Sequence, residues 1–363
     1  MVAKKIFIAG GGPVGLAAAL ELTRRNIPVR IVDPDAAVSP QSRALAVNSR
    51  TLDLMEASGT TEMLLAAGNR VNRVIIRKPG KTLASIDLRQ IRHRFNFLLV
   101  LAQSGTEEIL ASRLKQVGVK LERNLALDSF TEGKSIALAL SDGSIDNATC
   151  LIGADGAHSP VRKSLGLNFD GETDSGTFGL ADVELDDWPF AFDSMVLTVM
   201  DKHLAPFIPM ANGMGRFITT CPDCLNGLPG DAKVKRVLWE SDFSISYRQV
   251  QRYQKDNVFL AGDAAHIHSP VGGRGMNLGI EDACWLAWLI EQDRQEEYTS
   301  LRHPVGASVL KYTGRFTAFA RARGPLQDFF LGCALPVLIG IPNIRNRVFS
   351  MLTALDTPPP AWR

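Results

Sequence analysis

The sequence has few cysteines, and they form no complete metal or disulfide set. Five cysteines are scattered over 363 residues, and such an odd, sparse set is typical of reduced thiols in a reducing compartment. Cys221 and Cys224 have the spacing of a metal or redox pair, but no second CxxC or CxxH pair completes a zinc set. We interpret them as two ordinary thiols in a loop and expect no bound metal.

The sequence also lacks a long apolar run and a run of basic residues. No uninterrupted apolar stretch approaches the roughly 20 residues that span a bilayer, and Ile6 to Ala9 is too short for the core of a signal peptide. No basic run marks a nucleic-acid partner, and a net charge of +2 favours none. We therefore expect a cytoplasmic protein without a transmembrane segment.

One apolar segment near the C-terminus has two interpretations. The run from Phe329 to Ile341 is interrupted by Pro336, so we expect a helix that packs on the rest of the chain. Contact of this segment with a membrane surface is the alternative.

The first 32 residues follow a strand–turn–helix–strand pattern. Hydrophobic residues make up 45% of the chain, enough for a large core in one or two joined domains. Residues 4–9 are predicted to form a buried strand, Pro13 to Arg25 a helix, and residues 28–32 a second strand. Such a βαβ unit implies a parallel sheet.

The rest of the chain alternates between short strands and helices. Ser104 with Glu107 has the pattern of a capping box, and two turns are predicted at 141–143 and at Asn212-Gly213. Strands are predicted at 73–77, 97–101, within 119–152, within 178–220 and at 258–261, and helices at 48–57, 104–117, 275–292 and 304–322.

These patterns predict an α/β fold in three parts. A Rossmann-like nucleotide-binding domain with a mixed or parallel sheet is assigned to residues 1–70, 102–177 and 255–300. An inserted β-sheet domain for the substrate takes residues 71–101 and 178–254. C-terminal helices in residues 301–363 are expected to pack on the nucleotide-binding domain.

A glycine turn between the first strand and the first helix carries the strongest chemical signal. Residues 10–15 read GGGPVG, a GxGxxG motif. Gly10 permits the tight turn, Gly12 lets the backbone approach a pyrophosphate, and Gly15 lets the helix pack closely on the strand. The phosphates then lie at the helix N-terminus, where free N–H groups favour negative charge. Asp33 ends the second strand and is placed to accept ribose hydroxyls.

Two further segments place polar groups at the ends of strands. Residues 258–266 read VFLAGDAAH, so a strand delivers Asp263 to its carboxyl end, and a glycine loop at 270–277 then leads into a helix. The N–H groups of such a loop suit an anionic partner. Residues 151–162 contain a strand, the turn Asp155-Gly156 and a helix start. For this last segment alone, a purely structural turn is an equal alternative.

In this order and at these separations, the three segments resemble the class A flavoprotein monooxygenases, the para-hydroxybenzoate hydroxylase family. The resemblance covers nearly the whole chain. It implies that the GxGxxG motif binds the ADP half of non-covalent FAD, that Asp155 lies near the pyrophosphate and the nicotinamide path, and that Asp263 holds the ribityl chain. The neighbouring residues assigned to FAD are Pro13, Val14, Pro270, Gly272, Gly273, Gly275, Met276 and Asn277.

Weaker matches extend the resemblance. Ser42-Arg43-Ala44 with residues 48–52 is similar to the family's PRA…RTLE segment, which implies that Arg43 contacts FAD; a solvated arginine is the alternative. Gln103 matches the glutamine that opens a flavin-contacting helix, and Leu127 is by position a neighbour of the adenine. The sequence lacks the long thioredoxin-like domain of the phenol-hydroxylase-type members, which implies a compact member.

The resemblance implies an NAD(P)H-dependent monooxygenase. No second GxGxxG marks a stable nicotinamide site, and in the family NAD(P)H binds transiently, reduces the flavin and leaves. Oxygen then adds at the flavin C4a, and the hydroperoxide transfers one oxygen atom to a small aromatic or polycyclic substrate. Because the flavin supplies this chemistry, the protein supplies orientation and a dry pocket rather than a conspicuous acid–base pair.

The roles of several residues stay open on sequence alone. His266 follows the GD motif and either moves protons or ties the loop backbone. Arg274 stands where the family often has Gln or Lys, and it either faces the flavin pyrimidine or points to solvent. Phe207, Pro209 and Met210 are candidates for an apolar wall of the substrate pocket, with plain core as the alternative. Tyr247 is expected at the domain junction.

Other functions of the same fold remain as alternatives. A flavin-dependent halogenase is disfavoured, because Trp285 and Trp288 lie in a helical WxxW without the Ile-Pro of the halogenase motif. A reductase or oxidase, such as the geranylgeranyl-reductase-like enzymes, and a non-catalytic FAD-binding partner protein stay open. An NAD(P)H-dependent oxygen-consumption assay on the yellow protein separates these functions.

Overall fold

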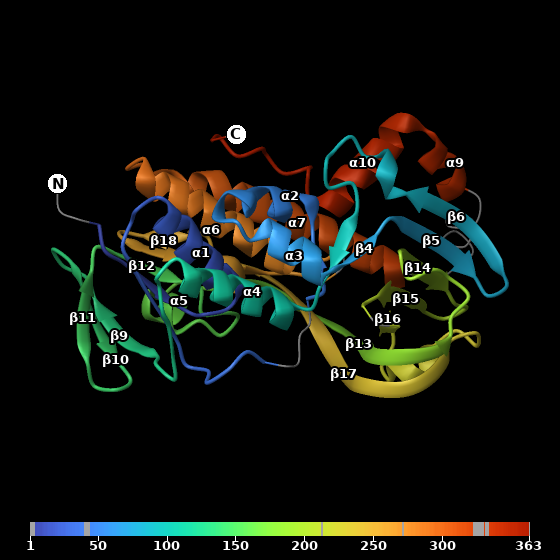
Figure 1. The fold of residues 1–363 in the computed structure, drawn as a ribbon, viewed down its shortest axis with the longest axis horizontal. Coiled ribbons are helices and arrows are strands. Elements are labelled where there is room, and N and C mark those ends of the chain that lie inside the picture. Colours follow the sequence, from blue (N-terminus) through green and yellow to red (C-terminus); the bar gives the residue numbers. More distant parts are fainter. Residues whose placement is uncertain are drawn as a thin grey trace.

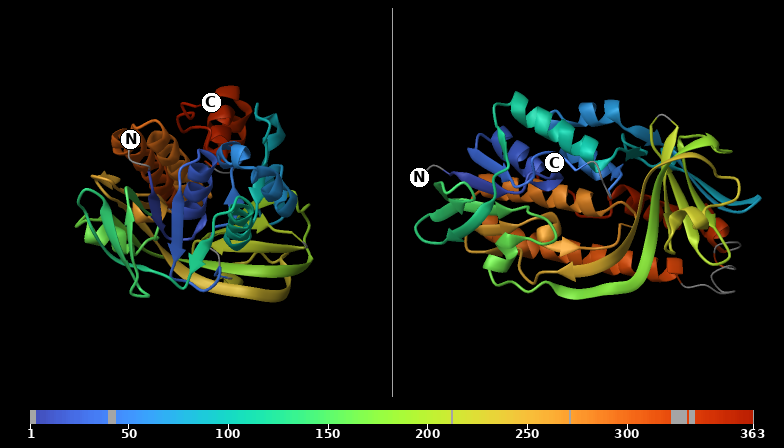
Figure 2. Two further views of the ribbon diagram at one scale, coloured as in Figure 1. Left: turned by 60° about the vertical axis from the view of Figure 1, so that its left-hand side comes forward. Right: turned by 90° about the horizontal axis from the view of Figure 1, so that it is seen from below.

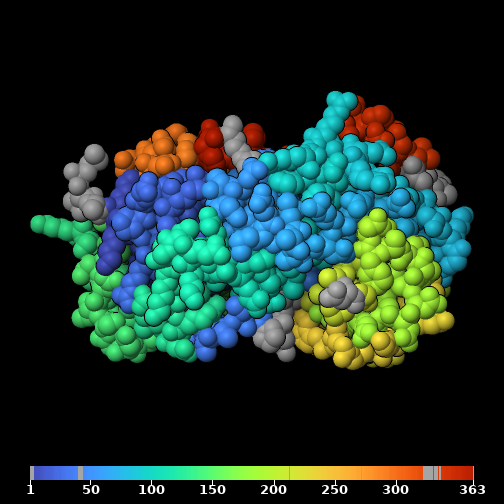
Figure 3. Space-filling view, in the orientation of Figure 1, coloured from blue at the N-terminus to red at the C-terminus, as the bar shows by residue number. Residues whose placement is uncertain are grey.

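The chain forms an elongated molecule with a sheet in each of two lobes (Figure 1). The structure is a computed structural model that describes residues 4–39, 44–211, 213–270, 272–321, 330 and 334–362. Two long strands run from one lobe to the other (Figure 2). The surface view shows the same division, with the N-terminal segments in blue at one end and residues of the second sheet in yellow-green at the other (Figure 3).

The first lobe contains a six-stranded sheet in the order β18-β19-β12-β1-β2-β8. All neighbouring strands are parallel except β18 and β19, so the parallel sheet predicted from the N-terminal pattern is confirmed. All four residues of β1 and of β12 are buried, as expected for strands covered on both faces. The strands are β1 (Ile6–Ala9), β2 (Val29–Asp33), β8 (Leu121–Arg123), β12 (Cys150–Gly153), β18 (Gln254–Lys255) and β19 (Val258–Leu260).

The second lobe is built on an eight-stranded sheet in the order β20-β17-β13-β16-β15-β14-β5-β6. The short strand β20 follows β19 in sequence and pairs with the end of β17, so the GD segment lies where the two sheets meet. The strands are β5 (Arg73–Lys78), β6 (Lys81–Asp87), β13 (Asp170–Asp187), β14 (Ser194–Val199), β15 (Leu204–Pro209), β16 (Met214–Thr219), β17 (Lys233–Gln249) and β20 (His266–Ile267).

Two three-stranded sheets complete the β-structure of the described residues. One follows the order β11-β10-β9 and the other β3-β7-β4. The second corrects an expectation: strands near 73–77 and 97–101 were predicted to share a sheet, but β7 pairs with β3 and β4 while β5 joins the eight-stranded sheet. The strands are β3 (Ala46–Val47), β4 (Asn69–Val71), β7 (Leu98–Val100), β9 (Leu127–Thr131), β10 (Ile136–Leu140) and β11 (Ile145–Ala148).

Helices cover the six-stranded sheet and continue into the C-terminal segment. The largest buried cluster lies between this sheet, α1 and α6. Among the described residues, no helix is both long enough and apolar enough to cross a membrane. The helices are α1 (Pro13–Arg24), α2 (Ser49–Leu54), α3 (Thr61–Ala67), α4 (Gln103–Gln116), α5 (Pro160–Ser164), α6 (Gly275–Glu291), α7 (Tyr298–Arg321), α9 (Leu335–Gly340) and α10 (Pro342–Thr353).

Several predicted helix ends and turns differ in detail. The capping box at Ser104 is wrong: α4 already begins at Gln103, and Ala102 precedes it without a side-chain cap. The backbone N–H of Gln103 donates to Ala44 (3.0 Å) beside β3. The region 48–57 divides into α2 and a 3₁₀ turn. The turn at 141–143 is confirmed by the left-handed φ of Gly143, whereas Asn212 lies outside the described residues.

The C-terminal segment contacts both lobes. Ile339 of α9 and Phe349 of α10 are buried in a cluster shared with β5 and β6, beside which these helices lie in Figure 1. Farther along, Trp362 packs against Trp285 and Trp288 of α6, with ring centroids 5.2 Å apart in both pairs. The segment predicted to pack on the nucleotide-binding part of the chain therefore also covers the eight-stranded sheet.

Candidate active site

The glycine turn at residues 10–15 has the geometry that a phosphate-binding turn requires. Gly10 has φ +109°, and a Cβ there would lie 2.3 Å from the carbonyl oxygen of Ala154. A Cβ on Gly15 would lie 1.9 Å from the carbonyl oxygen of Gly10, so only glycine lets α1 pack this closely on β1. Gly12 instead faces open space, with no atom within 4 Å of a Cβ position. These contacts confirm the steric roles of Gly10 and Gly15.

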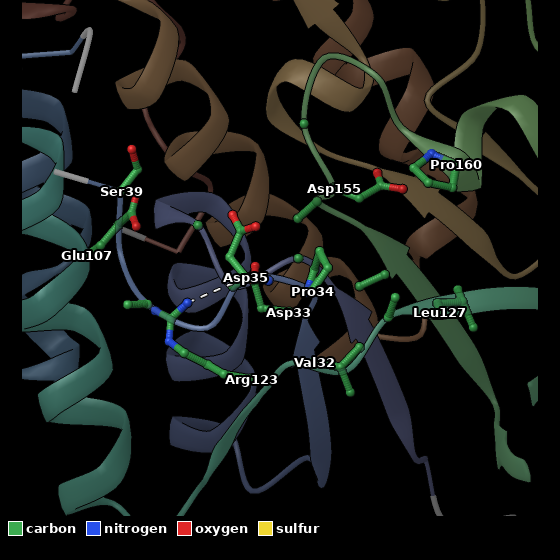
Figure 4. A pocket seen from close by; sticks show the side chains of 18 of the residues that line it. Val32, Asp33, Pro34, Asp35, Ser39, Glu107, Arg123, Leu127, Asp155 and Pro160 are labelled. Atoms are coloured by element: carbon green, nitrogen blue, oxygen red, sulfur yellow. Dashed lines mark hydrogen bonds and ion pairs between the residues drawn. The ribbon is translucent and has the colours of Figure 1, made fainter. Parts of the chain in front are cut away.

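A cleft of about 340 Å³ opens above this turn, within the usual range for small-ligand sites. Figure 4 shows side chains from several elements around it. Three of the residues assigned to FAD from the sequence, Gln103, Leu127 and Asp155, line it together with Gly10 and Gly12. Arg43 lies outside the described residues.

Asp33 is held at the end of β2 by three donors. Its Oδ2 accepts from the backbone N–H of Gly11 (2.5 Å) and its Oδ1 from that of Asp35 (2.9 Å). Arg123, at the end of β8, reaches Oδ1 at 3.5 Å (Figure 4). Glu107 of α4 lines the same cleft, and burial raises its pKa although Gln103 donates to it (2.8 Å). Arg123 and Glu107 were not foreseen as site residues.

The DG segment caps α5 and reaches the GD turn. Asp155 Oδ2 accepts from the backbone N–H of Val161 (2.9 Å), and burial raises the pKa of this carboxyl. Arg162 donates to the carbonyl oxygens of Ala264 (3.0 Å) and Ala157 (2.9 Å). Arg162, in the first turn of α5, therefore holds the backbone of the GD turn through Ala264. The sequence did not reveal this contact.

The GD turn lies between the N-terminal ends of α1 and α6. Gly262 has φ +61°, and a Cβ there would lie 2.8 Å from Val14. Gly279 of α6 is equally close, since its Cβ would lie 2.6 Å from Val14 and 2.9 Å from Gly262. Asp263, which follows Gly262, is exposed. Val14 thus serves as packing between the two helices, and the turn presents Asp263 outward.

The loop before α6 is fixed by its own backbone and by Asn277. Gly272 and Gly273 have φ values of +80° and +63°, and Gly273 N–H donates to the carbonyl oxygen of Pro270 (2.9 Å). Gly275 is the first residue of α6, where the N–H groups of the first turn have no intrahelical acceptor. Met276 packs against the apolar core beside this loop.

The side chain of Asn277, assigned to FAD from the sequence, is occupied by the protein. Its Nδ2 donates to the carbonyl oxygens of Ala46 (2.7 Å) and Gly273 (2.6 Å). Its Oδ1 accepts from the backbone N–H of Asn48 (3.0 Å) and the hydroxyl of Thr51 (2.7 Å). Asn277 therefore joins the glycine loop to β3 and α2, and a contact with FAD would have to come from its backbone.

His266 belongs to a buried ion network between α6 and α7. Its Nε2 lies 2.6 Å from Oδ2 of Asp282, and both side chains are 1% exposed. Arg302 of α7 donates to Asp282 and Glu281, at 2.7 Å in each case. Burial alone would raise the pKa of Asp282, but Arg302 and His266 hold it below its ordinary value. His266 therefore has a structural contact, but with the side chain of Asp282 rather than with the loop backbone expected as the alternative, and the network itself was missed.

His268 lies two residues farther, at the base of the loop. Its Nδ1 donates to the carbonyl oxygen of Ser269 (2.9 Å), and burial lowers its pKa to about 3. It is therefore neutral in the folded protein at neutral pH.

Acidification is expected to destabilise the protein through His268. In the unfolded chain this imidazole takes up a proton near its ordinary pKa of 6.5, whereas the folded chain takes it up only near 3. The contribution of neutral His268 to the free energy of unfolding is therefore fully present above pH 6.5 and is lost as the pH falls toward 3. The free energy of unfolding should fall by about 2 kcal/mol between pH 7 and pH 5. Urea unfolding of wild type and His268→Asn at both pH values tests this. An equal loss of stability in the two proteins would show that other groups cause the acid sensitivity.

Two of the four pocket candidates lie on the face of the eight-stranded sheet away from the C-terminal helices. Phe207 is fully buried against Trp188 (4.7 Å) and Phe217 (4.8 Å), which favours the alternative that it is a plain core residue. Side chains alternate along a strand, and Pro209 shares the face of Phe207. Met210 lies on the opposite face, in the cluster with the C-terminal helices.

Tyr247 lies where β17 approaches α7 and the start of the glycine loop before α6. Its ring is 3.7 Å from a Cβ position on Gly314, and its hydroxyl lies near Thr317 and Ser269. Burial raises the pKa of this phenol. Tyr247 is thus located at the junction of the two sheets. Its hydroxyl lies near Ser269, the residue that precedes the loop beginning at Pro270.

Arg274 does not point to solvent. The residue is 1% exposed, and Nη1 donates to the carbonyl oxygen of Met351 (2.9 Å) and to Oδ1 of Asp356 (2.8 Å). The solvent alternative is therefore wrong, because the C-terminal segment covers the loop. Neither partner could be recognised from the sequence around Arg274.

Comparison with known proteins agrees with this geometry. Residues 3–226 and 225–313 match the FAD binding domain family. The chain is 32% identical to 6-methylpretetramide 4-monooxygenase of Streptomyces rimosus, over 95% of this chain and 67% of that protein. It is 30% identical to rifampicin monooxygenase of Streptomyces venezuelae, over 97% and 78%. The fold matches p-nitrophenol 4-monooxygenase of Pseudomonas putida with a TM-score of 0.85 at 22% identity, over 96% and 99%.

The family match and the named relatives define an oxidoreductase, and its cleft lies at the ends of parallel strands. The chain belongs to the FAD binding domain family, and the resemblance to the class A flavin monooxygenases is confirmed. Its cofactor is FAD, and it is an FAD-dependent monooxygenase.

Proposed function

We propose that this chain uses NAD(P)H, FAD and dioxygen to hydroxylate a small aromatic or polycyclic molecule. One observation carries the proposal: the glycine turn at Gly10 and the DG segment at Asp155 line one cleft, and the GD turn at Gly262 packs against Val14 in the helix that leaves the glycine turn. The similar enzymes are named for 6-methylpretetramide and rifampicin, both polycyclic aromatic compounds, and the fold neighbour is named for p-nitrophenol.

The residues present suit an extended FAD molecule. Gly10, Gly12 and the N-terminus of α1 would hold the pyrophosphate, and Asp33 the ribose of the ADP half. Asp263 would bind ribityl hydroxyls, and the loop Gly272–Gly275 would donate N–H groups to the pyrimidine edge of the flavin. The open space over Gly12 and the cleft lined by Asp33 support this arrangement.

Bound FAD accepts electrons from NAD(P)H and activates dioxygen for the transfer of one oxygen atom. The protein's own contribution is to orient the substrate and keep water out. We place FAD in residues 1–70, 102–177 and 255–300, and the substrate beneath the sheet of residues 71–101 and 178–254, with residues 301–363 packed over both. Met210, in the cluster with the C-terminal helices, and Tyr247, near Ser269, are the pocket candidates that we keep for this substrate site.

Substrate-dependent turnover tests the proposal. The purified, FAD-loaded protein is mixed with NADH or NADPH and a panel of substituted phenols and tetracyclic phenols, and NAD(P)H oxidation and product are followed. We expect at least one compound to accelerate NAD(P)H oxidation and to gain a hydroxyl group. Unstimulated oxidation that converts all consumed oxygen into hydrogen peroxide would identify an oxidase of the same fold instead.

Replacing Asp263 with alanine is expected to weaken FAD binding about ten- to a hundredfold. The carboxylate stands exposed on the GD turn, and a lost charge-assisted hydrogen bond to a ribityl hydroxyl is worth roughly 1.5–3 kcal/mol. Titration of FAD into the apoprotein, followed by flavin fluorescence, measures the change. Asp256→Ala, in the exposed turn between β18 and β19, is the matched control. Equal affinity of Asp263→Ala and wild type would show that this carboxylate does not contact FAD.

A further inference from the structure

The C-terminal segment connects the lobe of the eight-stranded sheet to α6, the helix that follows the loop Gly272–Gly275 (the flavin loop). Phe349 of α10 is 3% exposed in the cluster shared with β5 and β6. Thr357 accepts a hydrogen bond from a buried arginine of α2 through its carbonyl oxygen (3.1 Å), and its hydroxyl lies 3.3 Å from Glu281 of α6. Trp362 then packs on α6. Residues 349–362 therefore form a strap across the molecule, visible in red in Figure 1.

Between these anchors the strap meets the flavin loop at one charged pair. Nη1 of Arg274 lies 2.8 Å from Oδ1 of Asp356, and its side chain is 2% exposed while that of Asp356 is 35% exposed. The carbonyl oxygen of Met351 accepts a second hydrogen bond from Nη1. Tyr312 of α7 also lies within the field of both charges. Because a buried guanidinium needs a counter-charge, Asp356 neutralises the one cation that the loop itself carries.

The other guanidinium nitrogen, Nη2 of Arg274, is buried and has no protein partner within the described residues. A buried donor without an acceptor is unfavourable. A hydrogen-bond acceptor that is not among the described protein atoms would therefore stabilise Nη2 of Arg274. Arg274 directly precedes the first turn of α6, where N–H groups also favour negative charge. In the ion pair of Arg274 with Asp356, the cation therefore belongs to the loop and the anion to the strap.

We propose that Asp356 is the counter-charge of Arg274, and that the pair positions the flavin loop and tunes the midpoint potential of bound FAD. The inference rests on the proposed placement of the flavin pyrimidine edge at Gly272–Gly275. Reduced flavin carries negative charge at that edge, so a nearby cation stabilises the reduced state and a nearby anion opposes it. Both side chains are positioning residues, which hold the loop and set the charge beside it.

Opposite shifts of the flavin potential test this inference. Asp356→Asn leaves the cation of Arg274 uncompensated, so the midpoint potential should become more positive. Arg274→Gln leaves the anion of Asp356, so the potential should become more negative, and the double variant should lie between them. Arg274→Lys keeps the charge and should remain near wild type. Dye-equilibrated reduction titrations of the FAD-loaded proteins measure all four values.

A matched control separates local charge from net charge. Asp293→Asn removes one carboxylate from a pair with Lys4 (2.6 Å) beyond the far end of α6, and its potential should equal that of wild type. A merely structural role for the pair would weaken FAD binding in both variants without shifts of opposite sign. Shifts of the same sign, or an unshifted potential in Asp356→Asn, would overturn the inference.

The outcome is independent of the hydroxylation assay. Opposite potential shifts in a protein that hydroxylates no compound of the phenol panel would support this inference and count against the proposed function. If the protein hydroxylates a compound but Asp356→Asn has the flavin midpoint potential of wild type, the result would support the function and overturn the inference. If Arg274→Gln does not fold, the sign of the shift in Asp356→Asn decides, because that carboxylate is partly exposed and its amide has the same shape.

Discussion

Replacing Arg302 with leucine is expected to lower the free energy of unfolding by about 3–5 kcal/mol. The guanidinium is 1% exposed and donates to both Glu281 and Asp282, which are themselves 1% exposed. Its loss leaves two carboxylates in the interior, where His266 contacts Asp282 and the hydroxyl of Thr357 contacts Glu281. Urea unfolding at neutral pH, followed by circular dichroism, measures the change.

An exposed pair provides the control for this prediction. Arg294 pairs with Glu297 at 2.7 Å on the surface, where ion pairs contribute little, so Arg294→Leu should leave the unfolding midpoint unchanged. Arg302→Lys retains the charge but not the two-pronged geometry, and should lie between wild type and the leucine variant. A midpoint for Arg302→Leu equal to that of Arg294→Leu would mean that the buried network does not stabilise the fold.

Replacing Gly15 with alanine is expected to abolish FAD binding and to destabilise the first lobe. The new Cβ would lie 1.9 Å from the carbonyl oxygen of Gly10, so α1 must move away from β1. Overpacking of this kind costs about 3 kcal/mol at the upper end of its usual range, and displaced N–H groups should reduce FAD affinity by more than about a hundredfold. Urea unfolding of the apoprotein and titration with FAD measure the two effects separately.

Gly12 separates cofactor binding from folding in the same turn. No atom lies within 4 Å of its Cβ position, so Gly12→Ala should change stability by less than about 1 kcal/mol, the difference between two N-cap residues. The methyl group would nevertheless occupy the space proposed for the pyrophosphate. We expect FAD affinity to fall about ten- to a hundredfold. Wild-type affinity would show that the pyrophosphate does not lie over Gly12.

The local features of the site could be predicted because short segments determine them. The turn at Gly10 and the helix start at Pro13 follow from backbone sterics within a few residues. The parallel sheet follows from the βαβ pattern. Even one distant relation was accessible: a GD strand and a GxGxxG strand in one chain imply two helix N-termini near one ligand, and α1 and α6 do pack together beside Gly262.

The remaining features depend on contacts between distant residues. Arg274 meets Asp356, 82 positions later, and nothing near either residue indicates the other. Phe207 was assigned to the pocket because an apolar residue on a strand can face either side, and only the arrangement of Trp188 and Phe217 decides which. A usable signal was overlooked in Glu281 and Asp282: adjacent acids inside an otherwise apolar helix require a buried cation.

Labelling with ¹⁸O₂ tests the monooxygenase function most directly. The FAD-loaded protein is supplied with NAD(P)H and a phenolic compound that stimulates turnover, under ¹⁸O₂ in unlabelled water, and the product is analysed by mass spectrometry. An FAD-dependent monooxygenase should place one ¹⁸O atom in each hydroxylated product and oxidise one NAD(P)H for each product formed. A product whose new oxygen comes from water, or one formed with no consumption of dioxygen, would contradict this function.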